Sequence, residues 1–170
     1  VRTEATGYGV TFFAEEMLRV KGESFDGKRV LVSGSGNVAI YAVEKVTQLG
    51  GTVVAVSDSD GVVLDEKGID LDLLKEVKEV RRERLTAYAA ARGGSARHTP
   101  GGSIWDIPCD VALPCATQNE LDESGAITLV ANGVGLVAEG ANMPTTPEAI
   151  RVLQDAKVLY APGKASNAGG

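Results

Sequence analysis

The stretch "RVLVSGSGNVAIYAVEKVTQLGGTVVAVSD", residues 29–58, decides the fold. Its pattern predicts a short buried strand at 29–34, a helix at 37–49 that ends at a pair of glycines, and a second strand at 52–58. The second strand is nearly all apolar, which is typical of a parallel strand covered by helices on both faces. The stretch is therefore a strand–helix–strand unit, whose crossover is right-handed in almost all proteins.

The rest of the chain continues this alternation. Further strands are expected at 110–114, 135–140 and 157–163, and further helices at 6–21, at 70–92, within 123–133, and within 144–156, where Thr145 or Thr146 caps the helix and Pro147 takes its first position. We expect a loop or a hairpin at 59–70 and a loop at 93–103. The alternation predicts one α/β domain with a doubly wound, Rossmann-type sheet that is mostly parallel and has helices on both faces.

The composition excludes several classes of function. The 170 residues carry a net charge of −6, whereas nucleic-acid binders need clustered Lys and Arg. No apolar run approaches the roughly 20 residues that cross a bilayer, and the start "VRTEATGYGV" has no signal-peptide pattern, so we expect a cytoplasmic protein. Cys109 and Cys115 match no metal spacing, so we expect reduced thiols and no metal. Because the chain starts at valine, we expect it to belong to a longer protein.

The turn after the first strand has the form G-x-G-x-x-A, the pattern of dinucleotide-binding loops. Its residues are Gly34, Ser35, Gly36, Asn37, Val38 and Ala39. The first glycine permits a tight turn, the second lets backbone approach a pyrophosphate, and the alanine allows the helix to pack closely on the strand. The N–H groups at the start of the helix then face the phosphates. This position between a strand and a helix favours dinucleotide binding over an ordinary glycine turn.

The residues after the second strand bear on the choice of cofactor. Asp58 lies where an acid usually accepts hydrogen bonds from the adenosine ribose of NAD, and its charge would repel a 2′-phosphate. Ser59 follows it with a hydroxyl donor. In the helix expected at 70–92, Lys78 and Arg81 lie three residues apart on one face and would clamp the 2′-phosphate of NADP. That face would equally serve as a solvated surface balanced by glutamates, so the residues alone leave NADP and NAD open.

Five strings of the chain, in their order, resemble the coenzyme domain of the hexameric glutamate dehydrogenases. They are "ATGYG" (5–9), "VSGSGNVA" (32–39), "LPCATQNEL" (113–121), "AEGANMPTT" (138–146) and "PGKASNAGG" (162–170). The resemblance covers essentially the whole chain, and "CATQNE" and "EGANMPTT" are far more specific than the glycine pattern. "SDSDG" (57–61) and "KEVRRERL" (78–85) resemble the NADP-dependent bacterial members, so the resemblance favours NADP over NAD. The domain of this family often has one strand reversed.

The resemblance implies roles for individual residues. Thr6 would lie near the nicotinamide, Asn37 near the phosphates and ribose, Ser59, Lys78 and Arg81 at the 2′-phosphate, Ala116, Thr117 and Gln118 at the nicotinamide ribose, and Asn142 and Asn167 at the carboxamide and nicotinamide ring. The strings that follow predicted strands fit the rule that ligands of open α/β sheets lie beyond the carboxyl ends of the strands.

The resemblance also implies a reaction, the reversible oxidative deamination of L-glutamate to 2-oxoglutarate and ammonia. The catalytic residues of this family lie in a separate substrate domain, so none is expected here, and the chain alone should bind NADP without turnover. The whole protein would be a homo-hexamer, whereas this segment alone could be a monomer. A leucine or phenylalanine dehydrogenase of the same superfamily and a stand-alone nucleotide-binding module are the alternatives.

Overall fold

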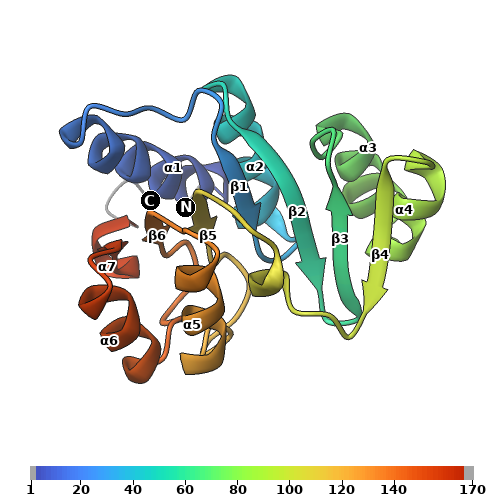
Figure 1. Ribbon diagram of the computed structural model, residues 1–170. Coiled ribbons are helices and arrows are strands. Elements are labelled where there is room, and N and C mark those ends of the chain that lie inside the picture. Colours follow the sequence, from blue (N-terminus) through green and yellow to red (C-terminus); the bar gives the residue numbers. More distant parts are fainter. Residues whose placement is uncertain (1–2, 167–170) are drawn as a thin grey trace.

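The computed structural model describes residues 3–166. Within them, seven strands form one sheet in the order β4-β3-β2-β1-β5-β6-β7 (Figure 1). The strands are β1 (Arg29–Val32), β2 (Thr52–Asp58), β3 (Gly61–Asp65), β4 (Ala96–Pro100), β5 (Val111–Leu113), β6 (Leu136–Ala138) and β7 (Leu159–Ala161). β1 pairs in parallel with β2 and with β5, and parallel pairing continues to β7. The predicted fold class is confirmed, and the strand order reverses between β1 and β5, where doubly wound sheets bind ligands.

The edge of the sheet beyond β2 is antiparallel. β3 turns back from β2, so that Asp58 pairs with Gly61, and β4 pairs antiparallel with β3. This confirms the hairpin alternative for 59–70, and β3 is the reversed strand that the family resemblance implied. The loop predicted at 93–103 is wrong, because Ala96–Pro100 forms the edge strand β4. This segment has polar residues and a proline instead of an apolar run, so its pattern does not predict a strand. An edge strand tolerates both features.

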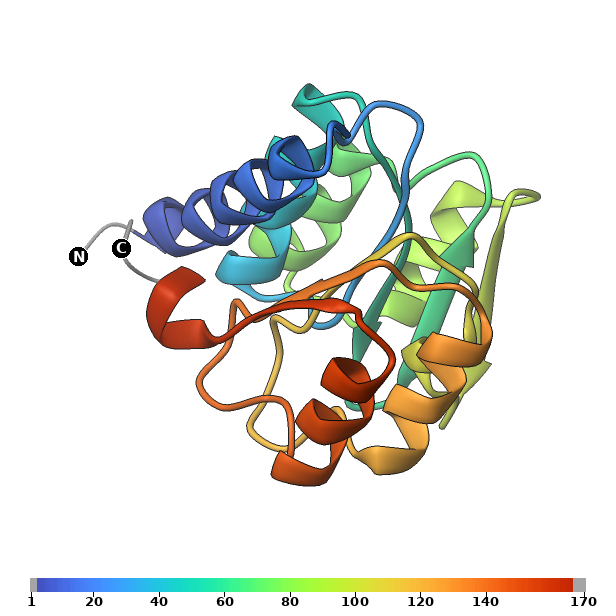
Figure 2. The ribbon, with the colours of Figure 1, turned by 60° about the vertical axis from the view of Figure 1, so that its left-hand side comes forward.

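Helices cover both faces of the sheet (Figures 1 and 2). One face carries α1 (Thr3–Val20), α2 (Asn37–Gln48), α3 (Leu71–Lys75) and α4 (Leu85–Arg92), and the other carries the 3-10 turn η2 (Ile104–Asp106), α5 (Glu123–Ala131) and α6 (Pro147–Asp155). The short α7 (Gly163–Ser166) follows β7 and packs near α1. In the described part of the chain, no helix has both the length and the apolar character needed to cross a membrane.

Alternating side chains of the central strands build two cores, one on each face. Val30 and Val32 of β1 point into the core that contains α1 and α2, whereas Leu31 points into the core that contains α5 and η2. In β5, Ala112 joins the second core in the same way. Burial of one such Val or Leu side chain contributes about 1.5–3 kcal/mol. The central strands are therefore anchored from both sides, and they hold the loops at their carboxyl ends in place.

The helix predicted at 70–92 is wrong in its middle. The chain forms α3, then a π-helical turn at Glu76–Val80 (η1), then a non-helical turn in which Arg82 has a φ of +54°, and then α4. Strong helix formers fill this segment, so propensity alone favours one continuous helix. The new helix starts where the N–H of Leu85 donates to the carboxylate of Asp58 at 2.9 Å. A contact between residues distant in sequence therefore overrides the local preference.

Two smaller predictions are confirmed. Thr146 caps α6 by accepting a hydrogen bond from the N–H of Ala149 at 3.2 Å, and Pro147 takes the first helical turn. Cys109 and Cys115 are free thiols, and both are buried. Burial raises the pKa of Cys109 to about 12, so this thiol stays neutral at physiological pH.

Candidate nucleotide-binding site

The loops at the carboxyl ends of β1, β5 and β6 touch one another. Gly34 follows β1 with a φ of +92°, and a Cβ at this position would lie 3.2 Å from the Cα of Ala116 and from the carbonyl oxygen of Cys115. A Cβ on Gly140, after β6, would lie 2.6 Å from the Sγ of Cys115. The three loops can pack this closely only because both positions are glycine.

Helix α1 brings a fourth segment to the same edge. A Cβ on Gly7 would lie 2.7 Å from the carbonyl oxygen of Val38, so the backbone of α1 crosses directly over the first turn of α2. Thr6, the residue before Gly7, is therefore held beside the glycine loop. A Cβ on Gly140 would lie 3.4 Å from side-chain atoms of both Val38 and Val10. Val38 and helix α1, which carries Thr6, thus pack against the loop after β6.

The start of α2 is open and carries unpaired donors. Gly36 is the N-cap residue, and it has no side chain with which to cap this helix. A Cβ on Gly36 would meet no described atom within 4 Å. The first N–H groups of a helix have no partner within it and carry the positive end of its dipole. With Ser35 buried behind this turn and Asn37 exposed in front of it, the arrangement fits the phosphates of a dinucleotide.

The carboxylate of Glu120 shapes the loop after β5. It accepts hydrogen bonds from the N–H groups of Ala116 at 2.9 Å and of Thr117 at 3.1 Å. Burial raises the pKa of Glu120 above its ordinary value, although these donors oppose the rise. The two bonds fold the loop so that Ala116, Thr117 and Gln118 are all exposed at the carboxyl edge of the sheet. These are the three residues that the sequence predicted for this part of the site.

We expect Glu120→Ala to weaken the binding of a nicotinamide dinucleotide about tenfold, because the N–H groups of Ala116 and Thr117 lose their acceptor and the loop loses its shape. Calorimetric titration with NADPH measures the effect. Glu148→Ala removes the same charge from an exposed position at the start of α6 and serves as the matched control. Equal affinities in the two variants would show that other contacts shape the loop.

Backbone contacts join the loop after β6 to the loop after β5. The N–H of Asn119 donates to the carbonyl oxygen of Met143 at 3.0 Å. The exposed Asn142 therefore lies next to the loop after β5, at the rim of a cavity of 590 Å³ that Tyr160 also lines. Asn142 thus belongs to the same edge as the glycine loop. Asn167, the other residue predicted at the carboxamide, lies outside the described residues.

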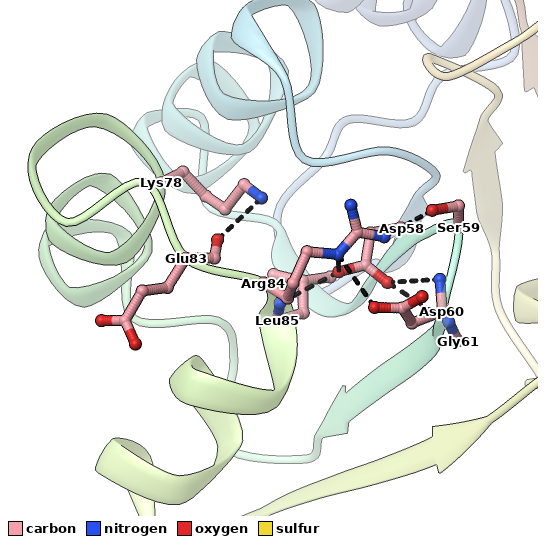
Figure 3. Close-up of polar contacts among 8 residues, drawn as sticks. All are labelled: Asp58, Ser59, Asp60, Gly61, Lys78, Glu83, Arg84 and Leu85. Atoms are coloured by element: carbon pink, nitrogen blue, oxygen red, sulfur yellow. Dashed lines mark hydrogen bonds and ion pairs between the residues drawn. The ribbon is translucent and has the colours of Figure 1, made fainter.

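The carboxylate of Asp58, at the end of β2, accepts hydrogen bonds from backbone groups of the same domain (Figure 3). One oxygen accepts from the N–H groups of Asp60 at 2.9 Å and Gly61 at 3.2 Å, and the other accepts from Leu85 at 2.9 Å. The side chain is only 5% exposed. Burial alone would raise the pKa of Asp58, but these donors and the Arg84 guanidinium lower it below its ordinary value. Both oxygens of this carboxylate are therefore already engaged.

The hydroxyl of Ser59 and the guanidinium of Arg84 meet at the end of β2. The guanidinium of Arg84 donates to the Oγ of Ser59 and, at 2.9 Å, to a carboxylate oxygen of Asp60. The ammonium of Lys78 donates at 2.9 Å to the carbonyl oxygen of Glu83, the residue before Arg84. The structure thus brings Ser59 and Arg84 into contact and ties Lys78 to the adjacent backbone (Figure 3).

Two glutamates engage the guanidinium of Arg81. It forms ion pairs with Glu83 and Glu76, and the premise that it shares an α-helical face with Lys78 does not hold, because Glu76–Val80 is π-helical. Arg84 was not among the residues predicted at the 2′-phosphate, because one continuous helix was expected over 70–92. The missing signal was the start of a new helix at Leu85, which places Arg84 against the end of β2.

The chain matches the model of the glutamate/leucine/phenylalanine/valine dehydrogenase family over residues 1–170. It is 57% identical to a glutamate dehydrogenase of Bacteroides thetaiotaomicron, 54% to an NAD(P)-specific glutamate dehydrogenase of Xylanibacter ruminicola and 53% to an NADP-specific glutamate dehydrogenase of Helicobacter pylori. These matches cover 99–100% of this chain but only 38–39% of each relative. The solved structure of Plasmodium falciparum glutamate dehydrogenase superposes with a TM-score of 0.94 and 40% identity, over 98% of this chain and 36% of that chain.

Proposed function

Because the chain belongs to the glutamate/leucine/phenylalanine/valine dehydrogenase family, we propose that residues 1–170 are the dinucleotide-binding domain of an NADP-dependent glutamate dehydrogenase. The three relatives described above all carry the name glutamate dehydrogenase. Their names support glutamate as the substrate of the whole protein over leucine or phenylalanine. The chain spans well under half the length of these relatives, so the rest of the enzyme's machinery belongs to other parts of the polypeptide.

In this proposal the cofactor lies along the carboxyl edge of the sheet. The phosphates rest on the open start of α2, where glycines allow close approach and N–H groups are free. Around them lie Gly34, Ser35, Gly36, Asn37 and Val38. The nicotinamide end lies against Thr6, Ala116, Thr117, Gln118 and Asn142, with Asn167 as a further contact. The adenosine end then reaches the end of β2.

The hydrogen bonds of the Asp58 carboxylate are the observation that favours NADP over NAD as the cofactor. A carboxylate that binds the adenosine ribose must offer its oxygens to the ribose hydroxyls, whereas both oxygens of Asp58 accept backbone N–H groups. Ser59 and Arg84 offer instead a hydroxyl and a guanidinium that is 48% exposed. A guanidinium binds phosphate through paired hydrogen bonds. With Lys78 on the adjacent backbone, these groups are suited to a 2′-phosphate.

Bound NADP supplies the acceptor for the hydride that L-glutamate loses on its way to 2-oxoglutarate and ammonia. The residues of this chain bind and orient that acceptor, since α2 holds the phosphates and the loops after β5 and β6 hold the nicotinamide end. The base and the groups that grip glutamate belong to a substrate domain elsewhere in the whole protein, which we propose is a cytoplasmic homo-hexamer. The 170-residue chain alone is expected to bind NADPH and to show no turnover.

Arg84→Ala is expected to weaken NADPH binding at least tenfold, or about 1.4 kcal/mol, and to leave NADH binding unchanged, because only NADPH carries a 2′-phosphate. Calorimetry with both cofactors at one fixed salt concentration measures the difference. Arg81→Ala removes the same charge nearby and is the matched control.

The two arginine variants separate the two possible phosphate contacts. Retained NADPH affinity in Arg81→Ala assigns the phosphate to Arg84, and lost affinity assigns it to Arg81 as the sequence predicted. A wild-type chain that binds NADH as tightly as NADPH would contradict the proposed NADP preference.

A further inference from the structure

Asp58 contacts both the turn that contains Ser59 and the segment that carries Arg84, two parts of the proposed 2′-phosphate site. Its carboxylate accepts N–H groups of the β2–β3 turn that contains Ser59, and it accepts the N–H of Leu85, the first residue of α4. The Nε of Arg84 lies 3.6 Å from the same oxygen that binds Leu85. One buried side chain thus ties together the turn, the start of α4 and Arg84 (Figure 3).

The start of α4 depends on this remote carboxylate. Arg84 occupies the N-cap position, and its own side chain makes no capping hydrogen bond. Asp58 supplies the acceptor from 27 residues away in the sequence. The preceding turn has its own contacts elsewhere, since Arg81 pairs with Glu76 and Glu83. Asp58 is therefore the buried side chain that joins the start of α4 to the end of β2, beside the exposed bonds of Arg84 to Ser59 and Asp60.

We propose that Asp58 is the positioning residue that creates the preference of this domain for NADP, by holding Ser59 and Arg84 in the arrangement that binds a 2′-phosphate. This inference rests on the proposed function. An acid at the end of this strand ordinarily indicates NAD, because it faces the ribose. Here the carboxylate faces inward, and three backbone N–H groups and a guanidinium balance its charge. An acid at this position usually repels a 2′-phosphate, whereas Asp58 would hold in place the groups that bind it.

Asp58→Asn tests this inference because asparagine keeps the shape and one acceptor oxygen but loses the charge and the second acceptor. We expect the Kd for NADPH to rise about tenfold and the Kd for NADH to stay within about twofold of wild type. Calorimetry of the chain with each cofactor measures both values. Asp72→Asn, which makes the same change at an exposed position of α3, is the matched control and is expected to bind both cofactors as wild type does.

A double-mutant cycle shows whether Asp58 acts through Arg84. In the Arg84→Ala background, Asp58→Asn is expected to change the Kd for NADPH by less than about twofold, because the group that it positions is already gone. Effects of the two changes that simply add would show that Asp58 acts independently of Arg84, and the inference would be overturned.

The other outcomes are equally decisive. A loss of NADH binding alone would identify Asp58 as a ribose ligand, and equal losses for both cofactors would identify a purely structural role, so either result overturns the inference. If Asp58→Asn does not fold, Asp58→Ser replaces it, because a serine hydroxyl can still accept one backbone N–H, and the same selective loss is expected.

The proposed function and this inference fail in different ways. A wild-type chain without a preference for NADPH contradicts the proposed function, and the inference falls with it. A wild-type chain that prefers NADPH, together with an Asp58→Asn variant that keeps the preference, overturns the inference alone.

Discussion

Replacing Gly36 with aspartate is expected to weaken NADPH binding by more than about 100-fold while the domain stays as stable as the wild type. Gly36 has a φ of −85°, which any residue adopts, and open space where a side chain would start. Aspartate is a preferred N-cap residue, so its carboxylate would accept the free N–H groups of α2 and add up to a few tenths of a kcal/mol of stability. The same carboxylate would occupy the donors that the phosphates need and would repel them.

Urea unfolding followed by circular dichroism measures the stability of this variant, and calorimetry measures its affinity for NADPH. Gly94→Asp is the matched control, because Gly94 also has open space around its Cα and lies in the turn before β4, on the antiparallel edge. It adds the same charge and is expected to bind NADPH normally. Normal NADPH binding by the Gly36 variant would place the phosphates elsewhere than at the start of α2.

Trp105→Ala is expected to destabilise the domain by about 3–5 kcal/mol, a large part of the roughly 5–15 kcal/mol that holds a typical domain together. Trp105 is 4% exposed in the core that contains α5. It packs against Gly125, where a Cβ would lie 3.0 Å from its ring, so α5 offers no side chain there to fill the cavity. The indole N–H also donates at 3.1 Å to the carbonyl oxygen of Glu120, and this bond supports the loop after β5.

Urea unfolding by circular dichroism gives the free energy of unfolding of each variant. Trp105→Phe keeps a large ring but loses the N–H, and the carbonyl of Glu120 then lacks this donor, so a loss of about 1–2 kcal/mol is expected. Ile127→Ala, at a position of α5 that is 53% exposed, is the control and is expected to change stability by less than about 1 kcal/mol. Comparable losses in Trp105→Ala and Ile127→Ala would show that the core refills around the missing ring.

Elements that depend on their own residues were predicted correctly, whereas elements that depend on contacts with distant segments were missed. The strand predicted at 52–58 has the bounds of β2, because an apolar run between a glycine pair and an acid contains all the information needed. The edge strand Ala96–Pro100 was missed, because pairing with β3 rather than its own composition makes it a strand. The break within 70–92 was missed for a similar reason, since the contact that starts α4 comes from β2.

The same difference between local and distant causes applies to the residues of the candidate site. The glycine loop is contiguous in the sequence, so its residues and the open helix start that they form could be predicted from Gly34 and Gly36. The roles proposed for Asp58 and Arg84 could not, because the sequence shows an acid after a strand but not the direction in which its carboxylate turns. The backbone N–H groups that bind that carboxylate come from Asp60 and Leu85, and only the folded chain brings Leu85 to it.

Because β1 pairs with β5, we expect the assembly of the site to be a late event in folding. These strands join segments far apart in the chain, as the bond from the N–H of Arg29 to the carboxylate of Asp110, 81 residues away, illustrates. Within residues 29–100 and within 110–161, strands that follow one another in the chain are neighbours in the sheet. The contact between β1 and β5, which we call the seam, instead closes a long loop, and its contacts must offset the conformational entropy lost in that closure. Gly34 and Ala116 meet only once the seam is closed. A dinucleotide that spans both halves would therefore bind the closed seam alone and, by mass action, suppress its opening.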